Sequence, residues 1–377
     1  MTYDLELETI QSGFDGEYFW GQARAGVIPG DPPIGIVTTQ RALRSGSDVY
    51  YAIAELRSND GGRTWDGPIE HTDTLGRRSE PGGWEAGICD MTPLYHAGTG
   101  RLLATGHTAR YTDDKHPPAN RARETVWTVC DLEKRTWTPW EMLTVPDEPL
   151  LEAQGAGCTQ RVDLADGTIL LPTYGAPRSD DSKRCRYGTV LRCGFDGRTL
   201  SYIEHGNLLS LPDPRGCLEP SLTRFNGRFY LTIRNDVRGY VCTSDDGLHF
   251  SEPTPWTFDD GSELGNYNTQ QHWVTHRDEL YLVYTRKGLN NDNVFRHRAP
   301  LMIGQVDPER LCVLRDTERE LVPNRGARLG NFGVCNVTPD EAWVTVSEWM
   351  QPVGCEQYGS DNTIWLARLK WHASNHD

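Results

Sequence analysis

Short apolar runs bounded by Gly, Asn, Asp or Pro recur along the whole chain, and no long stretch has helical periodicity. Short strands separated by regular turn signals are typical of all-β repeat architectures. The runs group into about six units of roughly three or four strands each, the pattern of propeller blades. The first unit, for example, contains 23–28, 34–39 and 49–56. The pattern therefore predicts an all-β fold, a six-bladed β-propeller.

The acidic strand Tyr3 to Ile10 has no unit of its own. We expect it to supply the outer strand of the last blade, which closes the ring and removes a free sheet edge. Seven blades are the alternative, because the loops 66–85 and 112–123 are long enough to confuse the phasing. Nothing resembles a linker, so residues 1–377 are expected to form a single domain.

Two turns share an order of Ser, Asp, Gly and an aromatic residue. Ser58 to Trp65 reads S-N-D-G-G-R-T-W after a strand-like run, and Ser244 to Phe250 reads S-D-D-G-L-H-F. Glycines permit the tight turn, the Ser and Asp side chains can bond the turn's own amides, and the Trp can cover them. We interpret both segments as structural clasps.

S-N-D-G-G-R-T-W resembles the Asp-box of the sialidase-like BNR β-propellers. In that superfamily the box joins the third and fourth strands of a blade and lies far from the active site. The resemblance therefore implies a fold, and the function must be sought elsewhere.

The composition excludes several classes of function. The net charge of -15 argues against nucleic-acid and anionic-membrane partners, and no apolar run reaches the roughly 20 residues of a membrane span. The N-terminus lacks a basic start and an apolar core, so a cytoplasmic protein is expected, or a secreted one if a leader was removed. The ten cysteines are spread singly without C-x-x-C spacing, which predicts buried thiols and no metal site. We expect no cofactor to be required. The sequence does not decide whether a structural calcium ion is bound.

Candidate chemistry collects at one rim. In a blade, the start of the innermost strand and the end of the second strand lie on the same face of the ring, because these strands are antiparallel neighbours. The residues at those positions are polar or ionisable: Gln22, Arg24, Gln40, Asp90, His107, Gln160, Arg161, Tyr174, Glu219, Arg234, Gln271, His272, Arg286, Asn331 and Glu348. We interpret this rim as a sugar-binding cup.

Three arginines stand in segments that resemble sialidase motifs. Arg24 lies in Q-A-R-A-G-V-I-P, which is similar to the family's R-I-P signature, and Arg298 in F-R-H-R-A-P-L looks like its last arginine. Glu219 and Arg234 lie in L-E-P-S-L-T-R-F-N-G-R-F-Y-L-T-I-R, which resembles a stretch carrying a Glu and then an Arg. Guanidinium groups bind carboxylates with bidentate geometry, and Glu219 could offset their repulsion. A small acidic oligosaccharide is thus the expected partner, although Arg24 or Arg298 could only brace loops.

The sequence also departs from sialidases. Those enzymes place an acid Asp on the loop after the second strand of the first blade, where this chain reads V-T-T-Q-R-A-L-R-S-G-S-D. Gln40 and Arg41 cannot act as acids, and Asp48 comes late, at the start of the next strand. The family's Tyr and Glu pair finds no clear motif, with Tyr358 as a candidate.

A second branch of these propellers fits better. A-R-A-G-V-I-P, G-S-D-V-Y-Y, G-H-T-A-R-Y and R-H-R-A-P-L together resemble propeller enzymes that act on rhamnosyl-glucuronate linkages. That resemblance implies a lyase that works by β-elimination. The alternatives are an exo-acting hydrolase, sialidase-like or α-L-rhamnosidase-like, using Glu219 or Glu348, and a sugar-binding propeller without catalysis.

Elimination from a uronate requires a neutralised carboxylate, a base for the hydrogen at C5 and an acid for the leaving oxygen. Arg234 and Arg298, assisted by Arg161 or Arg286, could neutralise the carboxylate. His107 or His272 is the expected base, with His297 as an alternative, and Tyr174 the expected acid. Gln22, Arg24 and Gln271 complete the predicted substrate-binding set.

Overall fold

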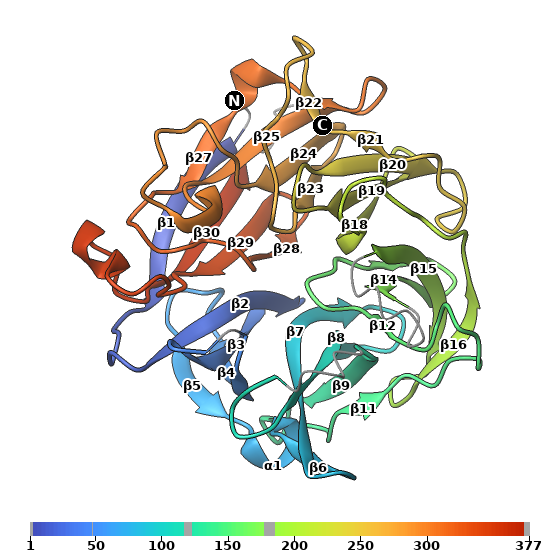
Figure 1. Ribbon diagram of the computed structural model, residues 1–377, viewed down its shortest axis with the longest axis vertical. Helices are drawn as coiled ribbons and strands as arrows, with labels where there is room; N and C mark the ends of the chain where they lie inside the picture. The colour runs from blue at the N-terminus through green and yellow to red at the C-terminus, as the bar shows by residue number, and fades with distance from the viewer. Residues whose placement is uncertain (1–2, 47, 117–122, 177–184, 373–377) are drawn as a thin grey trace.

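The computed structural model describes residues 3–46, 48–116, 123–176 and 185–372. Six sheets surround a common centre (Figure 1), so the all-β six-bladed propeller is confirmed and the seven-bladed alternative is wrong. Blades are numbered here in chain order, and each packs beside the next, with blade 6 beside blade 1. Part of the predicted loop 112–123 lies outside the described residues.

The strands of blades 1 to 3 follow the chain. Blade 1 has β2 (Tyr18–Ile28), β3 (Ile34–Leu43), β4 (Tyr50–Ser58) and β5 (Asp66–Glu70), followed by helix α1 (Thr72–Leu75). Blade 2 has β6 (Arg78–Glu80), β7 (Trp84–His96), β8 (Arg101–Tyr111), β9 (Thr125–Asp131), β10 (Thr136–Trp137) and β11 (Glu141–Met142). Blade 3 has β12 (Gln154–Gly155), β13 (Val162–Asp163), β14 (Thr168–Gly175), β15 (Cys185–Phe195), β16 (Leu200–His205) and β17 (Arg215–Gly216).

Blades 4 to 6 complete the ring. Blade 4 has β18 (Leu218–Phe225), β19 (Arg228–Arg234), β20 (Tyr240–Ser244) and β21 (Thr254–Pro255). Blade 5 has β22 (Thr257–Phe258), β23 (His272–His276), β24 (Glu279–Tyr284), β25 (Leu301–Asp307), β26 (Cys312–Val313) and β27 (Arg319–Val322). Blade 6 has β28 (Gly333–Thr338), β29 (Glu341–Ser347) and β30 (Ile364–Trp371). Short 3₁₀ turns cover Phe295–His297, Arg315–Thr317 and Cys355–Tyr358.

The N-terminal strand closes the ring as predicted. Strand β1 (Tyr3–Gln11) pairs antiparallel with β30, from Tyr3 opposite Trp371 to Gln11 opposite Ile364. The β1 strand therefore becomes the outer strand of blade 6, beside the orange and red C-terminal strands in Figure 1. Tyr3 is buried against Tyr281 and Trp371, so closure adds aromatic packing to the backbone hydrogen bonds.

Both predicted clasps are present between the third and fourth strands of their blades. Asp60 accepts the amides of Arg63 and Thr64 at 3.0 Å each, and Trp65 donates its indole N–H to a turn carbonyl at 3.1 Å. Asp246 likewise accepts the amides of Leu248 and His249 at 2.8 Å each.

Apolar side chains fill the spaces between neighbouring blades. Ile36 of blade 1, for example, shares a buried cluster with Ile88 and Leu102 of blade 2. The nine cysteines whose side chains are described are buried thiols, which agrees with the expectation for them. No helix within the described ranges has the length and apolar character needed to cross a membrane.

Candidate active site

A cavity of about 440 Å³ is lined by residues from all six blades, so it lies at the centre of the ring. Seven arginines contribute to its lining, against three acidic residues, Asp48, Asp90 and Glu219. A shallower depression of about 620 Å³ lies between blades 1 and 2 and contains none of the predicted site residues. The central cavity is therefore the candidate site.

Of the three arginines that the sequence predicted to meet one anion, Arg234 and Arg298 line this cavity and Arg24 does not. Arg234 ends strand β19, and Arg298 lies just before β25; their Nη2 atoms donate to the same Asn268 oxygen at 3.1 and 3.2 Å. Arg234 also forms a buried ion pair with Glu219. The two guanidinium groups therefore lie side by side at Asn268, and Arg234 is also within ion-pair distance of Asp236, at 3.4 Å.

Four of the lining arginines lack such a partner. Among the described residues, no carboxylate lies within ion-pair distance of Arg123, Arg296, Arg298 or Arg328. Arg328 donates to Gln351, and Arg123 donates to the Tyr174 hydroxyl at 2.7 Å. Burial, together with the charges of Arg234 and Arg328, lowers the pKa of Arg298 below its usual range. The cavity is thus strongly positive inside a chain whose net charge is -15.

Arg24 supports the cavity from below. The residue is fully buried and does not line the cavity; its Nη2 contacts Asp90 Oδ1 at 3.2 Å and Cys158 Sγ at 3.0 Å. Gln22 accepts the Asp90 amide at 2.7 Å. Burial opposes ionisation of Asp90, but His107 and Arg24 together lower its pKa well below the usual range. Arg24 and Gln22 therefore hold an ionised Asp90 in the cavity floor.

His107 lines the cavity, and an oxygen atom of the protein lies close to each of its two ring nitrogens. Its Nδ1 lies 2.8 Å from the Thr108 carbonyl oxygen, and its Nε2 lies 3.2 Å from Asp90 Oδ2. The Cys89 thiol also lies 3.5 Å from Nδ1. His107 is therefore held by three groups of its own blade, from Thr108, Asp90 and Cys89.

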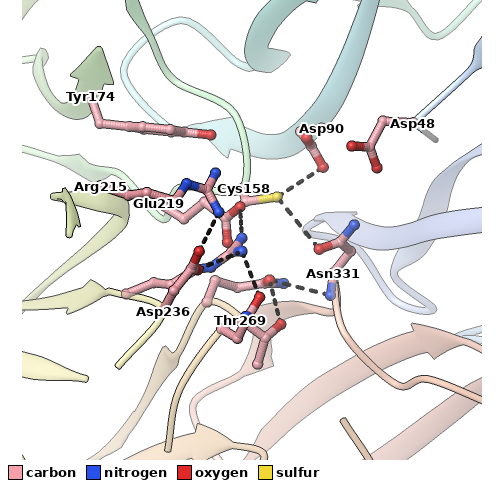
Figure 2. Close-up of polar contacts among 12 residues, drawn as sticks. Asp48, Asp90, Cys158, Tyr174, Arg215, Glu219, Asp236, Thr269 and Asn331 are labelled. Carbon is pink, nitrogen blue, oxygen red and sulfur yellow. Dashed lines mark hydrogen bonds and ion pairs between the residues drawn. The ribbon is translucent and has the colours of Figure 1, made fainter. Parts of the chain in front are cut away.

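Tyr174 ends near the cavity without lining it. Burial raises the pKa of its phenol well above the usual value, so the group remains neutral. In the view of Figure 2, Tyr174 lies above Arg215 with its hydroxyl end toward the middle of the group, and Asp90 and Asp48 lie on the opposite side. Cys158 in turn contacts Asp90 and Asn331.

Two residues of the predicted set lie in the interior of blades 4 and 5. His272 begins β23, where its ring contacts the Ser221 hydroxyl at 2.8 Å; burial first, and the Arg24 charge second, lower its pKa to about 3. Gln271 accepts from Thr232 and donates to the Thr269 carbonyl. Neither residue lines the cavity.

Three more predicted residues form contacts elsewhere. Arg161 pairs with Asp163 at 2.9 Å and donates to the backbone of blade 2. Arg286 is paired with Glu318 at 2.6 Å, and His297 contacts the Tyr267 hydroxyl at 2.6 Å. Arg161 and Arg286 were predicted from strand position alone, and His297 was predicted because it adjoins Arg298, but the direction of each side chain depends on bulges and neighbouring loops.

The sequence reasoning missed several lining residues. Asp48 lies on the loop between β3 and β4 in a left-handed conformation (φ 56°), and the structure brings it into the cavity. Its position after the second strand of the first blade was a usable signal that was discounted. Arg123, Arg215, Arg296 and Arg328 also contribute. Of these, Arg123 and Arg328 lie on irregular segments whose course depends on the rest of the ring.

One group of side chains has metal-ligating atoms close together: those of Cys89, Asp90 and His107 all lie within 4.8 Å of one another. Calcium takes oxygen ligands, so this mixed set does not suit it. A softer divalent ion would need the Cys89 thiolate, but burial raises the pKa of that thiol well above its usual value. Arg24 already pairs with Asp90. The expected structural calcium stays a prediction.

Known proteins place the fold. The model of the BNR repeat-like domain family matches residues 102–320, which is 219 of the 377 residues. No curated protein matches the chain. A protein of unknown function from Dyadobacter fermentans is 14% identical with a TM-score of 0.67, over 97% of this chain and 99% of that one.

Two sialidases share the same architecture. The NanB sialidase of Streptococcus pneumoniae is 10% identical with a TM-score of 0.64, over 96% of this chain and 70% of the other. A Trypanosoma rangeli sialidase mutant with trans-sialidase activity is 13% identical with a TM-score of 0.61, over 96% of this chain and 58% of the other. At such identities the likeness concerns the fold alone. By its matched sequence and its six-bladed architecture, the chain belongs to the family of proteins with a BNR repeat-like domain.

Proposed function

We propose that this propeller is a carbohydrate-active enzyme that binds the carboxylate of an acidic sugar in the central cavity and cleaves the adjacent glycosidic bond. The supporting observation is the set of lining guanidinium groups with no carboxylate partner among the described residues, Arg123, Arg296, Arg298 and Arg328. Arg298 and Arg328 are buried, and buried charges of one sign are costly without a counter-ion. A substrate carboxylate supplies that counter-ion.

The binding point for the first carboxylate is the pair Arg234 and Arg298. Both donate to the Asn268 oxygen, so their remaining N–H groups face a common region of the cavity. A carboxylate can accept charge-assisted hydrogen bonds from two guanidinium groups at once. Arg24, which the sequence placed in the same set, acts here through Asp90.

Hydrolysis is the reaction that the cavity supports best. Glycoside hydrolysis uses two carboxyl groups, one as acid and one as base or nucleophile. Asp48 and Glu219 both line the cavity, and one Glu219 oxygen has no hydrogen-bond partner among the described residues. Asp48 also occupies the loop on which, by the resemblance, sialidases place their acid. We assign Asp48 as the acid and Glu219 as its partner.

Elimination from a rhamnosyl-glucuronate linkage is the second candidate. Tyr174 favours it, because a neutral phenol held at 2.7 Å by Arg123 can donate a proton to a leaving oxygen. The arginines would stabilise negative charge that develops beside the carboxylate. The unpartnered oxygen of Glu219 is a better base than His107, whose nitrogens both face acceptors.

Product analysis separates these reactions. The wild-type protein is incubated with rhamnosyl-glucuronate and sialyl oligosaccharides. Hydrolysis gives saturated products, whereas elimination gives an unsaturated uronate that absorbs in the ultraviolet. We expect saturated products, with a loss of about 100-fold or more in kcat for Asp48→Asn and a small effect for Tyr174→Phe.

The control variant is Asp245→Asn, because this exposed side chain lies in the second clasp, away from the cavity. An unsaturated product together with a large loss for Tyr174→Phe would replace hydrolysis by elimination. Binding without turnover of any substrate would leave a sugar-binding propeller.

A further inference from the structure

We propose that the substrate of the central cavity carries two negatively charged groups, held by arginines on opposite walls of the ring. This inference rests on the proposed function and deepens it, because it narrows the substrate from an acidic sugar to a dianionic one. The first wall consists of three arginines in blades 5 and 6. The second wall is a single arginine in blade 2.

The first wall is built by Arg296, Arg298 and Arg328. Arg296 and Arg298 precede β25 of blade 5, and Arg328 precedes β28 of blade 6. The Phe295 ring brings two of them together, because its centroid lies 5.0 Å from the Arg296 guanidinium carbon and 5.4 Å from that of Arg328. Arg298 and Arg328 are buried, and Arg296 is exposed. One substrate carboxylate at this wall also reaches Arg234.

The second wall is built by Arg123, which lies two residues before β9 of blade 2. Its backbone lies beside His107, since a Cβ added at Gly155 would come within 2.7 Å of the His107 Cβ and 3.0 Å of the Arg123 Cβ. In a closed ring of six blades, blade 2 is three places from blade 5 in either direction. The strand that follows Arg123 therefore lies opposite blade 5 across the ring, and the Arg123 guanidinium contacts Tyr174 of blade 3.

The arginines between these walls already have counter-charges. Arg215 pairs with Asp236, and Arg234 pairs with Glu219. The lining arginines without an ion-pair partner among the described residues are therefore those of blades 2, 5 and 6, around a cavity of about 440 Å³. One carboxylate is too small to contact both sides at once. A second anionic group on the substrate satisfies Arg123 while the first is held by Arg298.

The number of anionic groups that the cavity binds can be tested by titration calorimetry with probes that carry one or two carboxylates. Gluconate and glucarate have the same carbon chain with one and two carboxylates, and galacturonate and digalacturonate form a second pair. We expect at least one dianion to bind about tenfold tighter than its monoanionic partner, with a steeper loss of affinity as salt is raised. Galactose serves as the uncharged control.

Variants of the two walls should respond differently. Arg123→Gln is expected to weaken binding of the dianion more than binding of the monoanion, so that the advantage of the dianion is lost, whereas Arg298→Gln weakens both probes by similar factors. Arg123→Lys should restore part of the advantage, because it keeps the charge. Tyr174→Phe should still bind the dianion more tightly than the monoanion. This result would show that Arg123 contacts the probe itself and does not act through Tyr174.

The possible failures are distinguishable. If neither dianion binds tighter than its partner in the wild type, or if Tyr174→Phe reproduces the effect of Arg123→Gln, the second anionic site is wrong while the proposed function stands. If no probe binds, or if Arg298→Gln leaves all affinities unchanged, the proposed function itself fails. The comparison within wild-type protein holds even if Arg123→Gln does not fold.

Discussion

Arg298 is held in the cavity at a cost to the folded state. Its guanidinium is buried, its described partners are oxygens of Asn268, and other arginines surround it. A buried charge without an opposite charge destabilises the protein unless a ligand provides one. Destabilising groups of this kind are typical of binding sites, because the same group that binds the ligand lowers the stability of the empty protein.

Replacing this charge should therefore stabilise the empty protein. For Arg298→Gln we expect the free energy of unfolding in urea to rise by roughly 1 kcal/mol, while acidic sugars no longer bind. Arg286→Gln is the control: that arginine is paired with Glu318 at 2.6 Å, so its loss should destabilise the protein. Equal destabilisation by both changes would show that Arg298 is a structural brace.

His272 gives the molecule a specific sensitivity to acid. Because burial lowers its folded-state pKa to about 3, the unfolded chain takes up a proton below its own pKa of about 6.5 and the folded chain does not. Stability is therefore lost as pH falls through this window, by about 1.4 kcal/mol per pH unit. Between pH 7 and pH 5.5, which covers about the first pH unit of this window, the free energy of unfolding should fall by roughly 1 kcal/mol more in wild type than in His272→Gln.

The control for that measurement is Ser201→Ala on the outer strand β16, which changes no titratable group and should keep the wild-type pH dependence. A wild-type protein and a His272→Gln variant with parallel pH profiles would contradict the assigned direction of the shift.

At the scale of single residues, the sequence placed part of the site. Glu219, Arg234 and Arg298 were found because resemblance and strand position agreed, and all three line the cavity. His272 and Gln271 occupy equivalent strand positions but face the interior. Which way a side chain turns at a rim is decided by bulges and contacts with other blades, and no local pattern contains that information.

The two clasps show what an element can encode by itself. In each, a serine and an aspartate satisfy amides of their own turn, so the conformation is fixed by a few consecutive residues. The sequence therefore predicted them correctly. Asp48, Arg123 and Arg328 reach the cavity on irregular segments, whose paths are set by distant parts of the chain.

Breaking the second clasp should affect stability and leave the site intact. Asp246→Ala removes the acceptor for the Leu248 and His249 amides, so we expect a lower Tm with unchanged affinity for acidic sugars. The neighbouring Asp245→Ala is the matched control, because that side chain is almost fully exposed. A Tm equal for the two variants would mean that the clasp contributes nothing.

At the scale of the whole molecule, closure of the ring decides whether the cavity exists. The pairing of β1 with β30 joins the two ends of the chain and covers the last sheet edge. The blade count and this closure were predictable, because each blade is a repeated unit with its own strand pattern. The residues that line the cavity were harder to predict from the sequence, because they come from six blades that meet at one centre.

Tyr3 tests the closure directly. It is 4% exposed and packs on Tyr281 and Trp371, so Tyr3→Ala should lower the free energy of unfolding by about 3 kcal/mol. Asp4→Ala, which changes an exposed neighbour on the same strand, should have little effect. A loss below 1 kcal/mol for Tyr3→Ala would indicate that the ring is held without this strand.

The most direct measurement is mass spectrometry of the products formed from a panel of acidic oligosaccharides by wild-type protein and by Arg298→Gln. Our account predicts that the wild type alone releases a sugar, and that the two products together contain the atoms of the substrate plus one water. Cleavage of uncharged oligosaccharides, or equal cleavage of acidic ones by Arg298→Gln, would contradict it.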